Sequence, residues 1–119
     1  GDLGFFYDSN GTWNQYLPSN FRIIVINNGG GGIFRLIEGP DKTGVMEEFF
    51  ETSHNYSVKG IAEAFRLKYF SADNTKKLEE TLKVFYAEDN SQPSVLEIFT
   101  PAEKNAEVFK AYIASFTNE

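Results

Sequence analysis

Two hydrophobic patterns alternate along the chain, one typical of strands and one typical of helices. Continuous apolar runs rich in β-branched residues predict strands, and residues 21–26 form the clearest run, typical of a strand covered on both faces. Apolar residues spaced three and four apart predict helices between these runs. The predicted elements are helix 5–17, strand 21–26, helix 57–66, strand 67–70, helix 74–87, strand 94–99 and helix 101–116.

Capping residues indicate where two of the helices begin. Thr100 can cap the last helix, Pro101 has the fixed φ that suits a first helical position, and Glu103 completes a capping box. Either Asp73 or Asn74 caps the third helix, and the sequence leaves both open. These signals support the helical assignment of the two segments that they precede.

Strands that alternate with helices predict an α/β fold, a three-layer sandwich in which a mostly parallel sheet lies between helices. We expect Trp13 and Tyr16 to pack the first helix against this sheet. Because 119 residues make one domain at most and the chain starts abruptly at Gly1 without a methionine, we expect residues 1–119 to be part of a larger domain. The apolar face that the last helix is expected to bury comprises Ala106, Phe109, Ile113 and Phe116.

Composition excludes several classes of protein. The formal net charge of −6 argues against a nucleic-acid partner, which requires a basic face. The chain contains no apolar run of roughly 18 residues, so no membrane span is predicted. The absence of cysteine excludes disulfides and thiolate metal sites, and it agrees with a cytoplasmic location.

The first candidate for chemistry follows the strand at residues 21–26, where Asn27 and Asn28 precede four glycines at residues 29–32. Ligands of open α/β sheets bind outside the carboxyl ends of the strands, and glycines let a ligand approach the backbone closely. Exposed N–H groups at such a turn suit a phosphate. A plain turn explains the glycines as well, and a non-catalytic, phosphate-binding domain of flavodoxin-like type would keep them without a metal.

A second candidate, Asp2, precedes Asn28 by 26 residues, about the span of a strand–helix–strand crossover. If a strand ended at Gly1, Asp2 and Asn28 would lie at the carboxyl ends of two parallel strands. One carboxylate, one amide oxygen and a backbone carbonyl form the all-oxygen set that Mg²⁺ prefers, with diphosphate oxygens completing the shell. The alternatives are a solvated or helix-capping role for Asp2 and a turn role for Asn28.

These residues carry a resemblance to a known family. The pair Gly1-Asp2 followed by Asn27-Asn28 resembles the metal–diphosphate motif of thiamine-diphosphate-dependent enzymes. The stretches GDLGFFYDSNG, NNGGGGIF, AEAFRLKYFSA and VLEIFT are similar to one family of that superfamily, 2-succinyl-5-enolpyruvyl-6-hydroxy-3-cyclohexene-1-carboxylate synthase of menaquinone biosynthesis. The resemblance covers essentially the whole chain and implies the C-terminal part of the domain that binds the diphosphate of the cofactor.

The resemblance implies a transferase that decarboxylates 2-oxoglutarate on thiamine diphosphate and adds the succinyl unit to isochorismate. It implies a homodimeric or homotetrameric parent whose catalytic glutamate lies in another domain, so this chain would hold no catalytic residue and would be inactive alone. Asp2, Asn28 and the carbonyl of Gly30 would bind Mg²⁺ or Mn²⁺. The implied cofactor-binding residues are Leu3 and Gly4 through their N–H groups, Asn28, Gly30, Ile33 and Phe34.

Some positions leave alternatives open. Gly4 stands where the family usually has serine, so one hydroxyl contact to the diphosphate would be missing. Acetolactate synthases and 2-oxoacid decarboxylases of the same superfamily usually carry Gly-Asp-Gly, and Leu3 therefore favours the synthase. Arg35 could face the pocket and His54 lies in a loop near the expected substrate side, but a surface position is the simpler interpretation of both.

Overall fold

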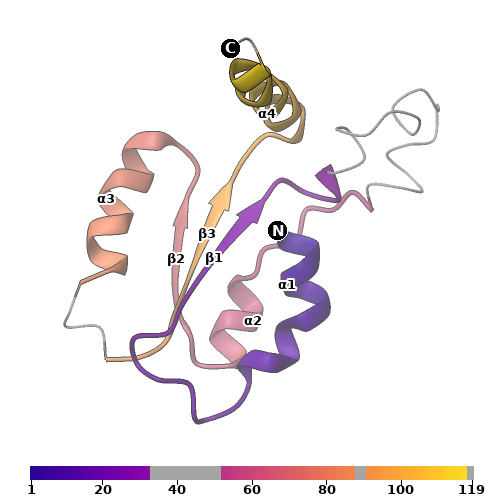
Figure 1. The fold of residues 1–119 in the computed structure, drawn as a ribbon. Helices are drawn as coiled ribbons and strands as arrows, with labels where there is room; N and C mark the ends of the chain where they lie inside the picture. The colour runs from indigo at the N-terminus through magenta and orange to yellow at the C-terminus, as the bar shows by residue number, and fades with distance from the viewer. Residues whose placement is uncertain (33–51, 88–90, 118–119) are drawn as a thin grey trace. The chain divides into compact units, whose positions relative to one another are not determined.

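A computed structural model of the chain describes residues 1–32, 52–87 and 91–117 (Figure 1). The chain forms two compact units. The first unit comprises Gly1–Asn27 and Tyr56–Phe99, and the second comprises Asn28–Asn55 and Thr100–Glu119. The sheet belongs to the first unit, so the carboxyl ends of its three strands all lie within one compact body.

The first unit is built on a three-stranded parallel sheet. Its strands are β1 (Arg22–Asn27), β2 (Lys68–Ala72) and β3 (Ser94–Phe99), and β3 lies in the middle of the order β1-β3-β2. Both pairings with β3 are parallel. The predicted α/β fold with a parallel sheet is therefore confirmed for the described residues, with strand bounds within two residues of those expected.

Helices of the first unit lie on both faces of this sheet (Figure 1). α1 contacts β1 and α2 contacts β2 on one face, whereas α3 contacts β2 and β3 from the other face. The helical elements of this unit are α1 (Asp2–Asp8), the 3₁₀ helix η1 (Ser9–Thr12), α2 (Lys59–Ala64) and α3 (Thr75–Phe85).

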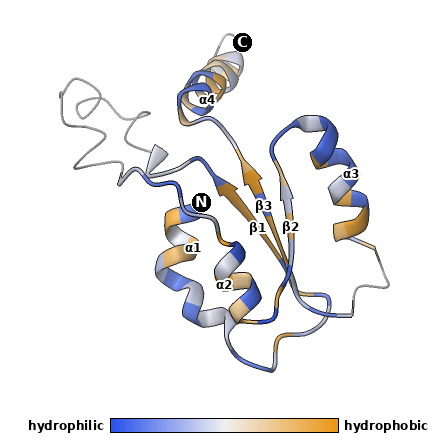
Figure 2. Cartoon of the chain, turned by 180° about the vertical axis from the view of Figure 1, so that it is seen from behind, coloured by the Kyte–Doolittle hydropathy of each residue, from blue (hydrophilic) through white to orange (hydrophobic). Residues whose placement is uncertain are grey.

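The main core lies between the sheet and the α1–α2 layer. Val25 of β1 and Val95 of β3 are buried there together with three residues from α2 and its flanks, namely Val58, Ala62 and Leu67. Phe5 and Phe6 of α1 pack against this cluster. β1 and β3 are hydrophobic along most of their length, as expected for strands that meet a core (Figure 2).

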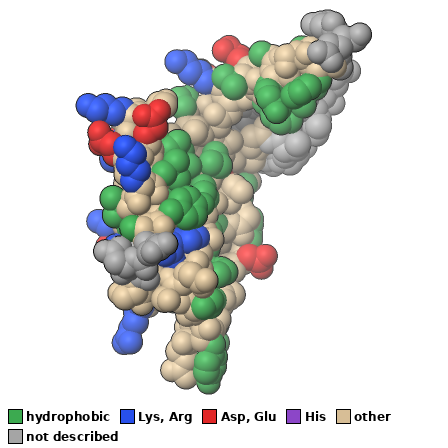
Figure 3. Space-filling model, turned by 60° about the vertical axis from the view of Figure 1, so that its left-hand side comes forward, with side chains coloured by type: hydrophobic (Ala, Val, Ile, Leu, Met, Phe, Trp, Pro, Cys, Tyr) green, Lys and Arg blue, Asp and Glu red, His purple; other side chains and the backbone are tan. Residues whose placement is uncertain are grey.

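The opposite face of the sheet is covered only in part. Phe85 of α3 is buried and meets the Phe70 ring edge to face at 5.6 Å. Ile24 and Ile26 of β1 are 44% and 42% exposed, and hydrophobic side chains gather on the surface beside α3 (Figure 3). The prediction that this strand is covered on both faces is therefore wrong, because α3 reaches β2 and β3 but does not cover Ile24 and Ile26.

The first helix differs from its predicted range of residues 5–17. α1 begins at Asp2 with Gly1 as its N-cap residue, and helical structure ends with η1 at Thr12. The earlier end agrees with the poor helix propensity of the Asn10-Gly11 pair. Trp13 and Tyr16 follow the helix and are 67% and 83% exposed, so the prediction that they pack against the sheet is wrong.

The second unit contains α4 (Ala102–Thr117), which begins one residue after the predicted first helical position, Pro101. Its first turn is tied by a hydrogen bond of 2.7 Å from the Asn105 side-chain amide to the hydroxyl of Thr100. The predicted burial of its apolar face is wrong for three of the four residues, and only Ala106 is half-buried. The exposed residues are Phe109, Ile113 and Phe116. Among the described residues, no helix combines the length and apolarity needed to cross a bilayer.

Candidate functional site

The N-terminus lies beside the carboxyl end of β1 (Figure 1). A Cβ atom added to Gly1 would stand 3.7 Å from the carbonyl oxygen of Ile26, so the two backbones are close neighbours. Asp2 begins α1 and is only 1% exposed, and its Oδ1 accepts a hydrogen bond of 3.0 Å from the Leu3 N–H. A solvated role for Asp2 is therefore wrong: the carboxylate is buried at the edge where the strands end.

Glycine is required in the turn after β1 by the backbone itself. Gly29 and Gly30 have φ values of 76° and 156°, a region that residues with side chains rarely adopt. Gly29 accepts a hydrogen bond of 3.0 Å from the His54 N–H, and a Cβ on Gly29 would approach the His54 carbonyl to 3.2 Å. A Cβ on Gly32 would require only that the Asn28 side-chain amide move aside. The backbone therefore requires glycine at positions 29 and 30.

The structure brings only part of the predicted site together. The N–H of Leu3 is engaged by Asp2, and a Cβ on Gly4 would meet nothing within 4 Å, so the serine usual in the family would fit there. Asn28 and Gly30 belong to the second unit and Asp2 to the first, and the pairing of Asp2 with Asn28 stays a prediction. Ile33, Phe34 and Arg35 lie outside the described residues.

The donor set agrees with a hard divalent cation on chemical grounds. Asp2 offers a buried carboxylate, Asn28 an amide oxygen and Gly30 a carbonyl, which are the oxygen donors that Mg²⁺ and Mn²⁺ accept. Within residues 1–32, 52–87 and 91–117, no group of three or more His, Cys, Asp or Glu side chains could hold a metal.

A buried carboxylate, Glu97 in the middle strand β3, was not predicted to have any role. It is fully buried and accepts four hydrogen bonds from neutral donors of the first unit. The Asn27 amide and the Val58 N–H donate to Oε1 at 2.6 and 3.0 Å. The hydroxyls of Ser57 and Tyr69 donate to Oε2 at 2.6 and 2.7 Å. One side chain therefore joins β1, β2 and the start of α2.

A sequence signal for this network does exist. Glu97 interrupts the otherwise apolar run VLEIF of a central strand, where a charged side chain is tolerated only if its oxygens are satisfied. The network also affects Tyr69, because burial raises the pKa of its hydroxyl above 10.0 and the adjacent Glu97 carboxylate raises it further. Tyr69 therefore keeps the proton that it donates to Glu97 up to a higher pH than an ordinary tyrosine.

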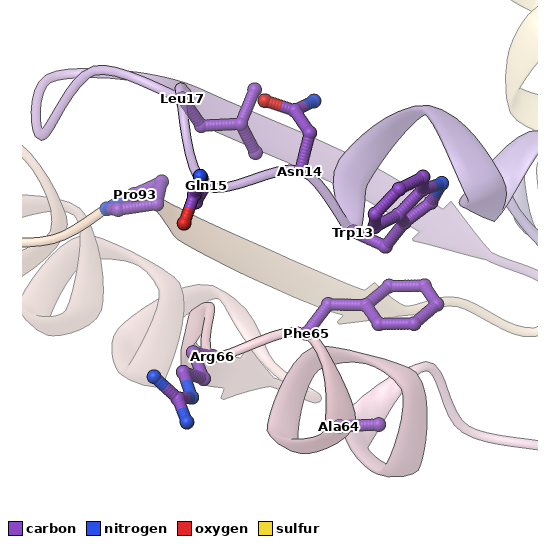
Figure 4. A pocket seen from close by; sticks show the side chains of 8 residues that line it. All are labelled: Trp13, Asn14, Gln15, Leu17, Ala64, Phe65, Arg66 and Pro93. Carbon is purple, nitrogen blue, oxygen red and sulfur yellow. The ribbon is translucent and has the colours of Figure 1, made fainter.

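A separate pocket of about 350 Å³ lies near the amino ends of the strands, because Leu17, Arg66 and Pro93 of its lining precede β1, β2 and β3 (Figure 4). Trp13 and Phe65 line one side of it, and Leu17 and Pro93, which precede β1 and β3, line the other (Figure 4). The pocket contains none of the predicted metal or cofactor residues. Its position differs from the carboxyl edge, where ligands of parallel α/β sheets bind.

Comparison with known proteins gives a consistent set of relatives. The chain is 44% identical over 117 residues to the 2-succinyl-5-enolpyruvyl-6-hydroxy-3-cyclohexene-1-carboxylate synthase of Flavobacterium johnsoniae, covering 98% of this chain and 21% of that protein. The synthase of Christiangramia forsetii is 47% identical over 112 residues, covering 94% and 19%. The chain is homologous to a segment of these synthases. The synthase of Porphyromonas gingivalis is 41% identical over 119 residues, covering 100% and 20%.

The chain thus spans about one fifth of the length of the synthases that it matches. No protein-family model matches the chain. The resemblance inferred from the motifs is nevertheless confirmed, because relatives of the same name align with nearly all of its residues. The alignment with the Porphyromonas gingivalis synthase covers the whole chain, so the buried Asp2, the glycine turn and Glu97 all lie in the shared region.

Proposed function

We propose that the chain is the metal- and diphosphate-binding segment, in the C-terminal domain, of a thiamine-diphosphate-dependent synthase of menaquinone biosynthesis. The identity of 44% to a synthase over 98% of the chain is the observation that carries this proposal. Two structural features support it. Asp2 is buried at the carboxyl edge of the sheet, and the turn after β1 has a backbone conformation suited to glycine.

In this proposal the chain binds and orients a cofactor rather than performing chemistry with its own side chains. Asp2, Asn28 and the Gly30 carbonyl hold Mg²⁺ or Mn²⁺, which neutralises the diphosphate. The N–H of Gly4 donates to the same diphosphate, and the N–H of Leu3 does so after exchanging its acceptor in this structure, Asp2 Oδ1, for a diphosphate oxygen. When bound, thiamine diphosphate would supply the chemistry for decarboxylating 2-oxoglutarate and transferring its succinyl unit to isochorismate.

Other parts of the parent complete the site in this proposal. Ile33 and Phe34 line the wall of the cofactor and substrate pocket, and they are the remaining predicted contacts of this chain. The glutamate that activates the cofactor comes from another domain of a homodimeric or homotetrameric cytoplasmic parent. The isolated chain is therefore expected to show no turnover and weak cofactor binding, because the glycine turn would have to be ordered without an opposing surface.

The proposal is tested by inserting the chain into the Flavobacterium johnsoniae synthase in place of the segment that it matches. We expect the chimera to consume 2-oxoglutarate only when isochorismate is present, and Asp2→Asn to raise the Mg²⁺ concentration for half-maximal activity by about tenfold or more. Asp8→Asn is the matched control, because Asp8 ends the same helix but is exposed.

Three outcomes separate the candidate functions. A folded chimera that turns over pyruvate alone would favour an acetolactate synthase or decarboxylase. A folded chimera whose Mg²⁺ dependence is the same for Asp2→Asn and Asp8→Asn would remove the metal role of Asp2. Isothermal titration of the isolated chain with Mg²⁺ and thiamine diphosphate adds an independent measurement, and a micromolar dissociation constant would contradict the weak binding expected without the rest of the parent.

A further inference from the structure

Glu97 lies where two distant parts of the chain meet. The Asn27 amide donates both to Glu97 and, at 2.9 Å, to the carbonyl of Tyr56. Two residues further from the sheet along each segment, the His54 N–H donates to the carbonyl of Gly29 at 3.0 Å. Two hydrogen bonds therefore pair the segments 27–29 and 54–58, and Glu97 accepts from Asn27 in one segment and from Val58 in the other.

We propose that Glu97 is a positioning residue that holds Asn27 at the end of β1 against Ser57 and Val58 at the start of α2, and so fixes the two points between which the paired segments and the glycine turn are connected. The assignment of a ligand to that turn rests on the proposed function, because Asn28 and Gly30 are its predicted metal donors. The positioning itself rests on described contacts alone. Asn28 follows Asn27 directly, so the hydrogen bond of Asn27 fixes where the turn begins.

The two carboxylate oxygens of Glu97 accept hydrogen bonds from different parts of the first unit. Oε1 receives the Asn27 amide and the Val58 N–H, which belong to the paired segments, whereas Oε2 receives the hydroxyl of Tyr69 from β2. The Ser57 hydroxyl also reaches Oε2 and accepts the Lys59 N–H at 3.1 Å, which links the carboxylate to the start of α2. Substitutions can therefore remove the contact to the paired segments or the contact to β2 separately.

Charge explains why a carboxylate is used at this position. A fully buried carboxylate must have its lone pairs satisfied, and each of the four neutral donors forms a charge-assisted hydrogen bond with it. A glutamine of the same shape offers one acceptor oxygen, and its NH₂ group would face donors instead of accepting from them. Glu97→Gln should thus release part of the network without creating a cavity.

The test measures amide hydrogen exchange in the 119-residue chain and uses two amide classes. The His54 N–H reports on the paired segments, and the amides of β3 report on global unfolding. We expect Glu97→Gln and Asn27→Ala to lower the protection of His54 relative to the β3 amides by about tenfold or more, the factor for a lost hydrogen bond to a charged group. Tyr69→Phe is the matched control, because it removes a bond of 2.7 Å from the same carboxylate on the β2 side.

Each outcome has a definite meaning. A selective loss of His54 protection in Glu97→Gln and Asn27→Ala, with little selective loss in Tyr69→Phe, supports the positioning role. Equal losses at His54 and β3 in all three variants would show that Glu97 contributes only global stability, and this result would overturn the inference. If Glu97→Gln fails to fold, the comparison of Asn27→Ala with Tyr69→Phe decides by the same criterion.

A second measurement separates this inference from the proposed function. Titration of the chimeric synthase with Mn²⁺ and thiamine diphosphate, followed by electron paramagnetic resonance of the free ion, compares the unsubstituted segment with Glu97→Gln and with Asp2→Asn. Weaker Mn²⁺ binding in both variants supports both ideas. Selective loss of His54 protection in the 119-residue chain, with Mn²⁺ binding of the chimera unchanged by Asp2→Asn, would support the positioning role and count against the metal role.

Discussion

At the scale of single residues, replacing Gly29 and replacing Gly60 by alanine should change the stability of the chain in opposite directions. Gly29 has a φ of 76°, and a Cβ added to it would lie 3.2 Å from the His54 carbonyl oxygen. Gly60 lies within α2, and a Cβ added to it would have nothing within 4 Å. We expect Gly29→Ala to lower the free energy of unfolding by about 1–2 kcal/mol. Gly60→Ala should raise it by about 0.5–1 kcal/mol, because alanine loses less backbone entropy in a helix.

Urea denaturation followed by circular dichroism measures both changes. The two substitutions add the same methyl group, so the opposite signs would isolate the effect of backbone conformation. A gain in stability for Gly29→Ala would show that the turn relaxes readily to a conformation open to other residues, and the requirement for glycine after β1 would then be lost.

Tyr69 predicts a specific dependence of stability on pH. Burial, and then Glu97, raise the pKa of its hydroxyl in the folded chain above the 10.0 of an ordinary tyrosine. The folded state therefore holds this proton more tightly than the unfolded state. The resulting stability is fully present below pH 10 and is lost as the pH rises through the higher folded pKa.

Comparing the unsubstituted 119-residue chain, the parent chain here, with Tyr69→Phe tests whether Tyr69 causes this pH dependence. At pH 7 we expect the variant to be less stable by about 1–2 kcal/mol, since it lacks a hydrogen bond to a buried carboxylate. Above pH 10 the difference in free energy of unfolding should shrink, because only the parent chain loses the contribution of Tyr69. Parallel stability curves from pH 7 to 11 would mean that the hydroxyl titrates equally in both states.

At the scale of elements, α3 resolves an alternative that the sequence left open. Asn74 is the N-cap residue, and its side-chain oxygen accepts the Lys77 N–H at 2.9 Å. Asp73 instead accepts a hydrogen bond of 2.8 Å from the Asn74 side-chain amide and forms an exposed ion pair of 3.9 Å with Lys77. We expect Asn74→Ala to cost about 1 kcal/mol of stability and Asp73→Ala about 0.5 kcal/mol or less. Thermal unfolding monitored at 222 nm (the helical signal) compares the two, and a larger loss for Asp73→Ala would reverse the assignment.

Elements were predictable from sequence where local pattern decides them. The apolar run of β3 was located correctly at residues 94–99, and Pro101 marked the start of α4. Burial was predicted less well, because it depends on what covers a face. Ile24 and Phe109 have the periodicity of core residues, yet both are exposed in this chain.

The candidate site was likewise predictable only where it depends on neighbouring residues in the sequence. Its sequence-local part, the glycine turn with φ values of 76° and 156°, follows from four consecutive glycines. The Glu97 network joins residues up to 70 positions apart. No local pattern gives the partners of such a carboxylate, although the polar residue within an apolar strand indicated that partners were needed. The pairing of Asp2 with Asn28 stays a prediction for the same reason, because it is non-local.

At the scale of the whole molecule, the distribution of apolar surface sets the solution behaviour of the chain. β1 pairs only with β3 in the described sheet, and Ile24 and Ile26 on its face are more than 40% exposed. An edge strand with an exposed apolar face is a template for pairing with another chain. The chain is also acidic, with a net charge of −6, and like charge opposes association at low salt.

These two tendencies predict self-association that strengthens with salt. We expect sedimentation velocity to show concentration-dependent association of the 119-residue chain, and Ile24→Thr with Ile26→Thr to weaken it by about tenfold or more, because apolar area is lost while β propensity is kept. Tyr7→Ser is the control, since Tyr7 is 79% exposed on α1, away from the strand. An equal effect of Tyr7→Ser would mean that exposed apolar area anywhere drives association. A monomer at all concentrations and salts would show that charge and edge geometry already prevent pairing through β1.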